Sequence, residues 1–360
     1  MKNLTWQNPE QLFVAQELIN KVKSKCCGIK VDIKSLNKEK CGLVESPLYS
    51  KEWLQYLESW RQLKPTIIEI SLNKNLVGYL FGVSKTVFGI KMFGSPLYGC
   101  ILPYMGFNLK EDVEKDYSQI LKGCIDYLKG ICGFQYISIC DLHNTEDRLK
   151  DLNFKFDSEK WETYILDIDK PLDEVKKGFS KTYRNYINYF AKHEGIVSED
   201  YSEDMILNHN AQLVDVYDRD GESSPDIINK YKIMFEKLIP HGMLYCVKAD
   251  IPTKKSIGSS IYLYGGEWAY FLTNATYSEN LNDRPNQSMM WEAIQHFHEK
   301  GVKKMDLVGP GQYKKYYGGE YTIFYNITVS RFGIHKAMLL LRKAYIYCVK
   351  SKFISKLLGK

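Results

Sequence analysis

The sequence contains no hydrophobic run near the roughly 20 residues that a helix needs to cross a bilayer. Its first residues, MKNLTWQNPEQ, include no apolar signal region. Its nine cysteines include no pair at CxxC spacing, and their odd number does not fit a fully paired disulfide framework. These absences predict a cytoplasmic protein with reduced thiols and no bound metal.

Acidic residues are missing from the last part of the chain. From Tyr321 onward there is no Asp or Glu, whereas eight residues are Lys or Arg, so this tail accounts for the whole formal net charge of +6. Apolar residues recur among these charges over Ile334–Leu358, which predicts a final basic helix. Such a helix packs on the body with a charged outer face, which is the simpler interpretation. The alternative is peripheral contact with the anionic inner surface of a membrane.

The length of 360 residues fits two domains. Both halves show the same order: helix, strand, turn, strand with an early glycine (Gly78 or Gly258), helix, glycine, strand. This order predicts an α/β (α+β) fold in which mixed sheets are flanked by helices. We expect helices at 8–23, 50–60, 111–129, 181–195, 226–238 and 286–300, and strands at 66–72, 76–84, 134–140, 243–249, 257–264, 268–276 and 303–308.

Four segments of the second half carry a resemblance through their order. They are Lys181–Gly195 (K-x-x-R-N…G), Tyr217–Gly221 (YDRDG) with Tyr231 after it, Ala269–Ile294 with the later Asp306–Gly309, and Tyr313–Gly319 (YKKYYGG). In this order they resemble the Fem family of peptidyl- and aminoacyl-transferases and its acetyltransferase-like relatives. The resemblance covers about half of the chain. It departs from some members in two places, since the long coiled-coil arm between Gly221 and Pro240 is missing and the stretch between Gly309 and Lys314 is short.

The resemblance implies two tandem GNAT-like (acyl-CoA N-acyltransferase-like) domains, at 1–166 and 167–320. A last segment, 321–360, then returns as a strand to the first domain and ends in the basic helix. In the family the lysine that Lys314 matches lies at the substrate carboxylate or phosphate and at the reacting carbonyl, so Lys314 is the candidate catalytic residue. The cleft is expected between the domains, with these candidate substrate-binding residues: Tyr183, Arg184, Arg219, Tyr270 and Tyr313.

Each candidate also has a plain structural interpretation. Lys314 stands beside Lys315, and on spacing alone a solvated lysine is the simpler explanation. Arg184 offers a bidentate anion clamp, or it belongs to a solvated basic helix face. Arg219 offers the same clamp, or it pairs locally with Asp218 and Asp220.

The residues Asn286, Gln287 and Ser288 follow Pro285 at a helix start, where acetyltransferase folds bind the cofactor's pyrophosphate. The usual glycine-rich signature is absent, and ordinary N-capping is the competing interpretation. We expect Asp306 to be a structural turn residue. His296 and His298 are two apart on a helix, so we expect surface positions and no metal.

Acyl transfer to an amine requires a positioned nucleophile, donors for the oxyanion and a base, but no covalent nucleophile or metal. The leading interpretation is transfer of an aminoacyl or acyl group to an amine of a cell-envelope precursor, such as the stem-peptide lysine of peptidoglycan. The donor is aminoacyl-tRNA or acyl-CoA. The first alternative is acyl-CoA-dependent N-acylation of an amino sugar or small amine. The second is a non-catalytic protein that binds a glycan or nucleotide-sugar.

Overall fold

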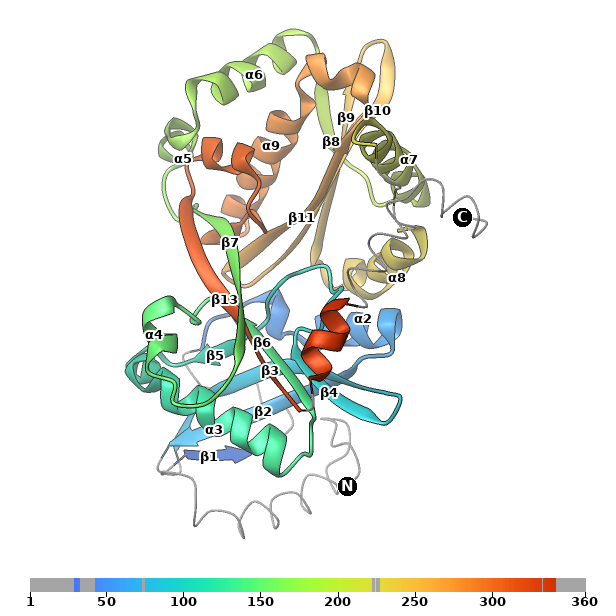
Figure 1. Cartoon of the computed structure of the whole chain (residues 1–360). Coiled ribbons are helices and arrows are strands. Elements are labelled where there is room, and N and C mark those ends of the chain that lie inside the picture. Colours follow the sequence, from blue (N-terminus) through green and yellow to red (C-terminus); the bar gives the residue numbers. More distant parts are fainter. Residues whose placement is uncertain are drawn as a thin grey trace. The chain divides into compact units, whose positions relative to one another are not determined.

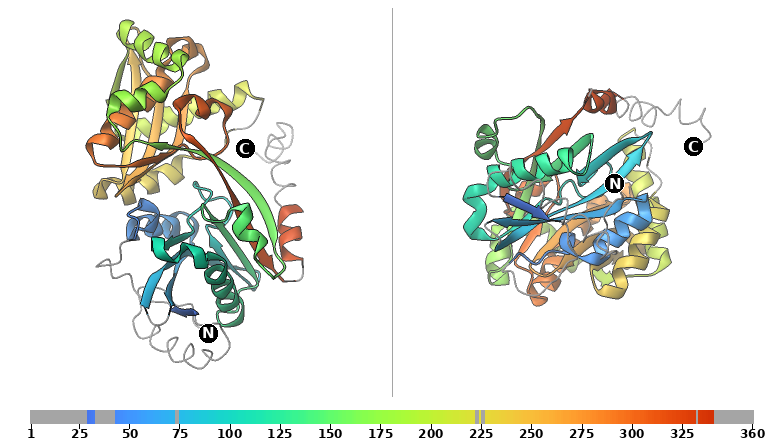
Figure 2. Two further views of the ribbon diagram at one scale, coloured as in Figure 1. Left: turned by 90° about the vertical axis from the view of Figure 1, so that its left-hand side faces the viewer. Right: turned by 90° about the horizontal axis from the view of Figure 1, so that it is seen from below.

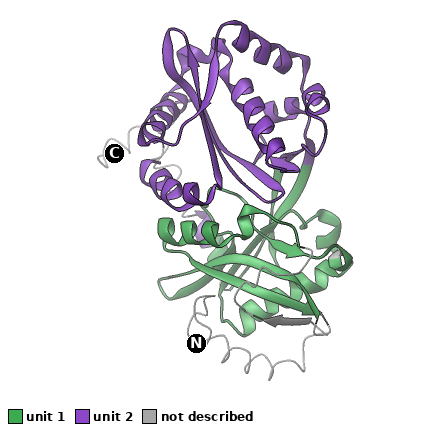
Figure 3. Ribbon diagram, turned by 180° about the vertical axis from the view of Figure 1, so that it is seen from behind, with its two compact units in different colours: residues 1–162, 322–336 green, residues 163–321, 337–360 purple. Residues whose placement is uncertain are grey.

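The computed structural model describes residues 29–32, 43–72, 75–221, 224, 227–331 and 333–340. The helix expected at 8–23 and the tail beyond Leu340 lie outside these residues. The chain forms two compact units (Figure 3): unit 1 is Met1–Glu162 with Thr322–Lys336, and unit 2 is Thr163–Tyr321 with Ala337–Lys360. No described helix is both long enough and apolar enough to span a bilayer.

Unit 1 is built on a mixed sheet of neighbours β1-β2-β3-β4-β6-β13, with β5 paired to β3 (Figure 1). All pairings are antiparallel except β4 with β6. Within β13 it is Tyr325–Ser330 that pairs with Tyr136–Asp141 of β6. The strands are β1 Ile29–Asp32, β2 Lys64–Leu72, β3 Asn75–Val87, β4 Ile90–Ser95, β5 Phe107–Leu109, β6 Tyr136–Asp141 and β13 Glu320–Ser330.

The helices of unit 1 are α2 (Lys51–Arg61), α3 (Tyr117–Gly130) and α4 (Glu146–Lys150). Ser50 caps α2, because its hydroxyl accepts from the Trp53 amide at 3.1 Å. The α3 helix buries an apolar face against β-strand residues in one core cluster. It starts later than the expected residue 111, because the charged run Glu111–Asp116 forms a 3₁₀ turn with only Val113 buried among its described side chains.

Unit 2 contains the neighbouring strands β7-β12-β11-β10-β9-β8, in which only β11 and β12 run parallel. The strand expected at 303–308 is shorter, because Val308 adopts a left-handed φ of 51° that ends the extended backbone. The strands are β7 Asp157–Asp167, β8 Ile196–Glu199, β9 Leu244–Ile251, β10 Lys254–Gly265, β11 Trp268–Thr276 and β12 Lys304–Asp306.

Helices cover both faces of the unit 2 sheet (Figures 1 and 2). Successive side chains of a strand point to opposite faces. Ser259 of β10 meets His209 of α7, whereas the next residue, Ser260, meets Met289 of α9. The two helices therefore lie on opposite faces. The helices are α5 Leu172–Gly178, α6 Lys181–Lys192, α7 Glu203–Arg219, α8 Ile228–Leu238 and α9 Pro285–Glu299. The expected α/β fold of mixed sheets flanked by helices is confirmed.

The early glycines of the two halves allow close approach of neighbouring chain segments. A Cβ on Gly78 would lie 2.3 Å from the Asn108 carbonyl oxygen, because β5 pairs with β3 at this point. A Cβ on Gly258 would lie 2.5 Å from the Thr276 hydroxyl oxygen. Both distances are below any real Cβ contact. At Gly78 a backbone oxygen blocks the Cβ, so β3 requires glycine there, whereas at Gly258 the Thr276 side chain would have to move.

We predict that Gly78→Ala lowers the free energy of unfolding by about 2–4 kcal/mol, because a backbone oxygen must move to admit the methyl group. Gly130→Ala is the matched control, since nothing lies within 4 Å of its added Cβ. The control should change stability by less than about 1 kcal/mol. Urea denaturation checks both, and equal effects would contradict the packing argument.

Candidate functional site

The residues singled out from the sequence all belong to unit 2. Lys314 lies in a 3₁₀ helix, Gln312–Tyr317, that follows β12 after a loop. The loop contains two consecutive left-handed residues, Val308 at φ 51° and Gly309 at φ 92°. A β-branched residue rarely adopts this conformation, so the strain at Val308 marks a constrained position.

The side chain of Lys314 is buried, with a residue exposure of 7%. Its ammonium donates to the carbonyl oxygens of Val308 (2.5 Å) and Gly309 (3.4 Å). The rings of Phe271 and Tyr313 lie 5.8 and 5.7 Å away. An ammonium has three N–H bonds, and among the described residues only two oxygens accept from it. One N–H is therefore left for a ligand oxygen.

Asp306, at the end of β12, is fully buried and holds the loop in place. Its carboxylate accepts from the Val308 amide at 2.6 Å and from the Thr163 hydroxyl. The expectation of a structural turn residue agrees with these contacts. Asp306 also acts on Lys314 through its charge, in the opposite sense to burial. Burial lowers the pKa of Lys314 to about 8, and the nearby carboxylate raises it in part.

Tyrosines from two segments surround the lysine helix. Tyr183 of α6 is buried, and its hydroxyl donates to the Tyr313 carbonyl at 3.2 Å. Its ring lies 4.8 Å from Tyr317 and 5.5 Å from Tyr316. Burial also raises the pKa of Tyr183, which keeps the phenol a neutral donor. Tyr313 and Tyr316 are about half exposed, so they present aromatic faces to solvent next to Lys314.

The two candidate arginines have structural partners. Arg184 donates through Nη1 to the carbonyls of Lys177 (2.9 Å) and Phe179, at the end of α5. Arg219 lies in the last turn of α7, with its Nε 3.6 Å from the Asp220 carboxylate, and both side chains are exposed. These are the plain interpretations weighed above. A further role of either residue as an anion clamp stays a prediction.

The start of α9 is held by side chains yet lacks a cap. Asn286 accepts from the Thr276 hydroxyl at 2.6 Å, and Gln287 hydrogen bonds to the Tyr183 hydroxyl, which lowers the Tyr183 pKa against the effect of burial. No side chain caps the helix at Arg284, and the buried Ser288 hydroxyl has no hydrogen-bond partner. The backbone amides of this first turn are therefore the groups that an anion at the helix start would contact, whereas the Ser288 hydroxyl has no solvent access.

Tyr270 and His296 are both less exposed than the sequence analysis suggested. Tyr270 of β11 is buried, with its ring stacked on Trp268 at 5.9 Å, and its predicted role in substrate binding stays a prediction. His296 is not the expected surface residue, because its ring stacks on Tyr245 at 3.9 Å and its side chain is 16% exposed. Among the described residues, no group of three or more His, Cys, Asp or Glu is placed to hold a metal.

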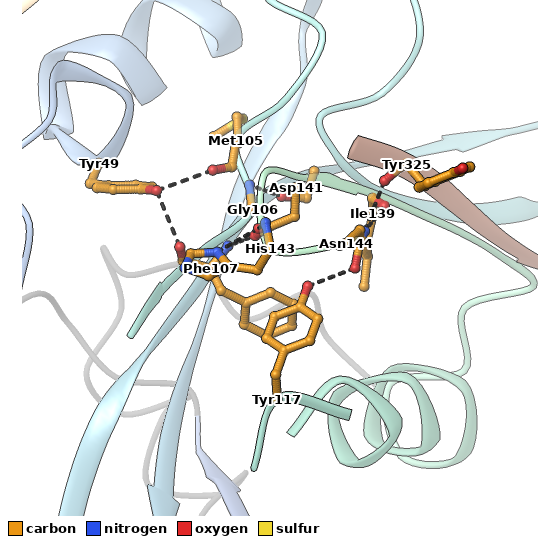
Figure 4. A network of polar contacts seen from close by, with 11 residues as sticks. Tyr49, Met105, Gly106, Phe107, Tyr117, Ile139, Asp141, His143, Asn144 and Tyr325 are labelled. Atoms are coloured by element: carbon orange, nitrogen blue, oxygen red, sulfur yellow. Dashed lines mark hydrogen bonds and ion pairs between the residues drawn. The ribbon is translucent and has the colours of Figure 1, made fainter. Parts of the chain in front are cut away.

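Unit 1 contains a polar network that the sequence analysis did not find (Figure 4). The buried carboxylate of Asp141 accepts from the Phe107 and His143 amides, and His143 Nδ1 lies 2.6 Å from it. Asn144 donates to the Ile139 and Tyr325 carbonyls and accepts from the Tyr117 hydroxyl. The signal was the polar run that starts at Asp141, the last residue of the buried strand β6, and continues to Asn144.

A second missed network lies in unit 2 between α7, β10 and β11. The imidazole of His209 is fully buried, with Nδ1 2.7 Å from the Ser259 hydroxyl and Nε2 3.0 Å from the Thr273 hydroxyl. Gln212 bonds to Ser259 and to the Ser256 carbonyl. Burial lowers the pKa of His209 to about 3, so the ring is neutral. A Ser–His pair without solvent access is a structural network.

Comparison with known proteins gives the fold. No protein-family profile matches the sequence, and no curated protein matches it. A crystal structure of FemX is similar over 81% of this chain and 94% of that chain, with a TM-score of 0.65 and 13% identity. The structure of L-PGS from Bacillus licheniformis is similar over 96% and 98%, with a TM-score of 0.51 and 11% identity. The chain therefore has the Fem-like fold that the resemblance implied.

The pKa of Lys314 gives a prediction about stability. The folded pKa of about 8 lies below the ordinary value of 10.5, so between these values the unfolded chain binds a proton that the folded chain does not. Stability should therefore rise by about 2 kcal/mol from pH 7 to pH 9.5. Urea denaturation of Lys314→Met should lack this contribution. A pH dependence identical in the two proteins would show that the ammonium is not buried.

His209 predicts a dependence of the same sign at acidic pH, where stability also falls as the pH falls. Because its folded pKa of about 3 lies below the ordinary value of 6.5, falling pH protonates the unfolded chain first. The folded state should lose about 2.5 kcal/mol of stability between pH 7 and pH 4.5. His209→Gln removes the titrating group and should show a correspondingly smaller loss over this range.

Proposed function

We propose that this protein is an acyltransferase that moves an aminoacyl or acyl group to an amine of a cell-envelope precursor, such as the stem-peptide lysine of peptidoglycan. The observation that carries the proposal is the buried ammonium of Lys314, which two main-chain carbonyls hold in place. The fold supports it, because the chain is similar to FemX along most of its length. The substrate class comes from the Fem resemblance of the motifs.

The chemistry of acyl transfer suits this lysine. When an amine attacks an ester or thioester carbonyl, the C–N bond forms and the carbonyl oxygen becomes negative. The C–O or C–S bond then breaks, and the proton that the attacking nitrogen loses passes to the departing oxygen or sulfur, which leaves as an alcohol or thiol. A fixed cation in a buried site stabilises that oxygen more than water would. With a pKa of about 8, Lys314 is mostly protonated at neutral pH and can donate its remaining N–H to the oxyanion or to a substrate carboxylate or phosphate.

The tyrosines beside Lys314 supply the rest of the binding surface in this proposal. Tyr313 and Tyr316 offer half-exposed rings, and Arg284 lies over the Tyr186 ring at 4.5 Å. Aromatic faces and cations together suit a nucleotide-linked donor or acceptor. The donor in the leading proposal is aminoacyl-tRNA.

One observation favours acyl-CoA as the donor instead. The first turn of α9 has no side-chain cap, and the Ser288 hydroxyl beside it is buried without a partner. Backbone amides at a helix start bind phosphate well. In this second candidate function the protein N-acylates an amino sugar or a small amine. A non-catalytic glycan-binding protein is the third alternative, since fold alone does not fix function.

The test is a transfer assay with mass-spectrometric detection. Purified protein is mixed with aminoacyl-tRNA or an acyl-CoA and with a UDP-linked muramyl peptide or glucosamine. We expect product with one donor, and Lys314→Met should lower kcat/KM by about 100-fold or more. Lys315→Met is the matched control, because this adjacent lysine is exposed. Its ammonium contacts only the outer Tyr316 ring among the proposed site residues, at 5.0 Å, so the substitution should leave kcat unchanged.

Each outcome selects one alternative. Product from aminoacyl-tRNA supports the leading proposal, and product from acyl-CoA alone supports the second. The third alternative, a non-catalytic binding protein, predicts no turnover with either donor. It also predicts that the UDP-linked peptide raises the melting midpoint of both the wild type and Lys314→Met. Equal rates for Lys314→Met and Lys315→Met would show that Lys314 has no role in catalysis.

A further inference from the structure

The turn between β3 and β4 in unit 1 carries an unusual residue. Val87 pairs with Ile90, so Phe88 and Gly89 are the two central residues of a tight hairpin. Their φ angles are 48° and 77°, both in the left-handed region. Two-residue hairpins with this backbone strongly prefer Asn-Gly, Asp-Gly or Gly-Gly, because a larger side chain is strained there. Phenylalanine is therefore a costly choice for the turn itself.

Packing of the Phe88 side chain within the protein does not offset this backbone strain. Phe88 is 100% exposed, and its neighbour Val87 is 37% exposed. A single exposed apolar side chain is ordinary. An aromatic ring that is both fully exposed and placed in a strained turn is not explained by folding, and it points to something outside the chain that receives the ring.

The chain segment that contains the hairpin carries charge of one sign. No Asp or Glu occurs between Glu69 and Glu111, a stretch that contains four lysines. Lys85 and Lys91 lie on the two strands of the hairpin, close to its tip. Lys85 pairs with Met92, and Lys91 pairs with Thr86. The Lys85 ammonium lies 3.1 Å from the Arg61 carbonyl, which brings the basic end of α2 to the root of the hairpin.

Further cations lie next to these two lysines. Lys64, at the start of β2, pairs with Ser84 of β3. Gln135 accepts from the Lys91 amide, and its own carbonyl accepts from the Arg331 amide. The root of the hairpin is therefore bordered by these basic residues: Arg61, Lys64, Lys85, Lys91 and Arg331.

We propose that the β3–β4 hairpin is a membrane-contact element whose tip, Val87 and Phe88, inserts into the interfacial region of an anionic lipid surface. The ring moves out of water into the boundary between the lipid headgroups and the acyl chains, while the flanking lysines bind lipid phosphates. A lipid surface fits better than a protein groove, because it needs no matching shape and its negative charge complements the uniformly basic segment. This site is separate from Lys314 and does not depend on the proposed reaction.

The experiment is flotation of the full-length protein with vesicles of phosphatidylcholine, with and without phosphatidylglycerol. We expect flotation only with the anionic vesicles, and Phe88→Asn should weaken it about tenfold. Lys85→Gln with Lys91→Gln should weaken it as well and reduce its salt sensitivity. The matched control is Ile196→Ser, because Ile196 is 58% exposed on β8 in unit 2 and should not contribute.

A stability readout separates loss of contact from loss of fold. Asparagine suits the left-handed turn, so Phe88→Asn should raise the melting midpoint by about 1–2 °C while it weakens flotation. Phe88→Trp should keep flotation and show a blue-shifted emission with anionic vesicles. The proposal is overturned if Phe88→Asn floats as the wild type does, if Ile196→Ser loses as much, or if the full-length protein floats on neither vesicle.

Discussion

A buried positive charge must be surrounded by oxygen atoms, and this requirement of Lys314 explains the loop between β12 and its 3₁₀ helix. Val308 and Gly309 adopt left-handed backbone conformations, and their own carbonyl oxygens accept hydrogen bonds from the Lys314 ammonium. Asp306 holds the Val308 amide, and its charge opposes the desolvation of the lysine. Gly311 is needed for the same reason, because a Cβ there would lie 3.3 Å from Lys314 Cε and 2.8 Å from the Tyr313 ring. The strained backbone at Val308, the two glycines and the buried carboxylate of Asp306 thus all accommodate the Lys314 ammonium.

Both units also place a buried polar network where strands must be held to neighbouring segments. In unit 1, Asn144 joins the Ile139 and Tyr325 carbonyls, so it links β6 to β13. In unit 2, His209 joins Ser259 to Thr273, so it links α7 to β10 and β11. A buried polar group that loses its partner costs about 1–3 kcal/mol, so a wrong pairing of these segments is penalised. Apolar packing alone would not discriminate between registers as strongly.

The sequence predicted what depends on local patterns. The helix after Ser50, the two strands with Gly78 and Gly258, and the helix that starts at Pro285 all follow from capping, periodicity and glycine placement. It also picked Lys314, but only through resemblance, because adjacent lysines have the same local signature. It missed the contacts made by distant residues: the hydrogen bonds of Arg184 to the end of α5, the ring of His296 on Tyr245, and the Asp141 network. These depend on tertiary packing, which no periodicity encodes.

The strands β7 and β13 each cross from one unit to the other, so unit 1 is not continuous in the sequence. During synthesis from the N-terminus, the ribosome delivers β6 long before Tyr325–Ser330, the segment that pairs with it. Nearly all of unit 2 emerges in between. The edge of β6 that β13 will occupy therefore stays open while about 180 further residues are made, at roughly 5–20 residues per second. An unpaired edge invites wrong partners, so a chaperone that shields nascent strands would matter more for unit 1 than for unit 2.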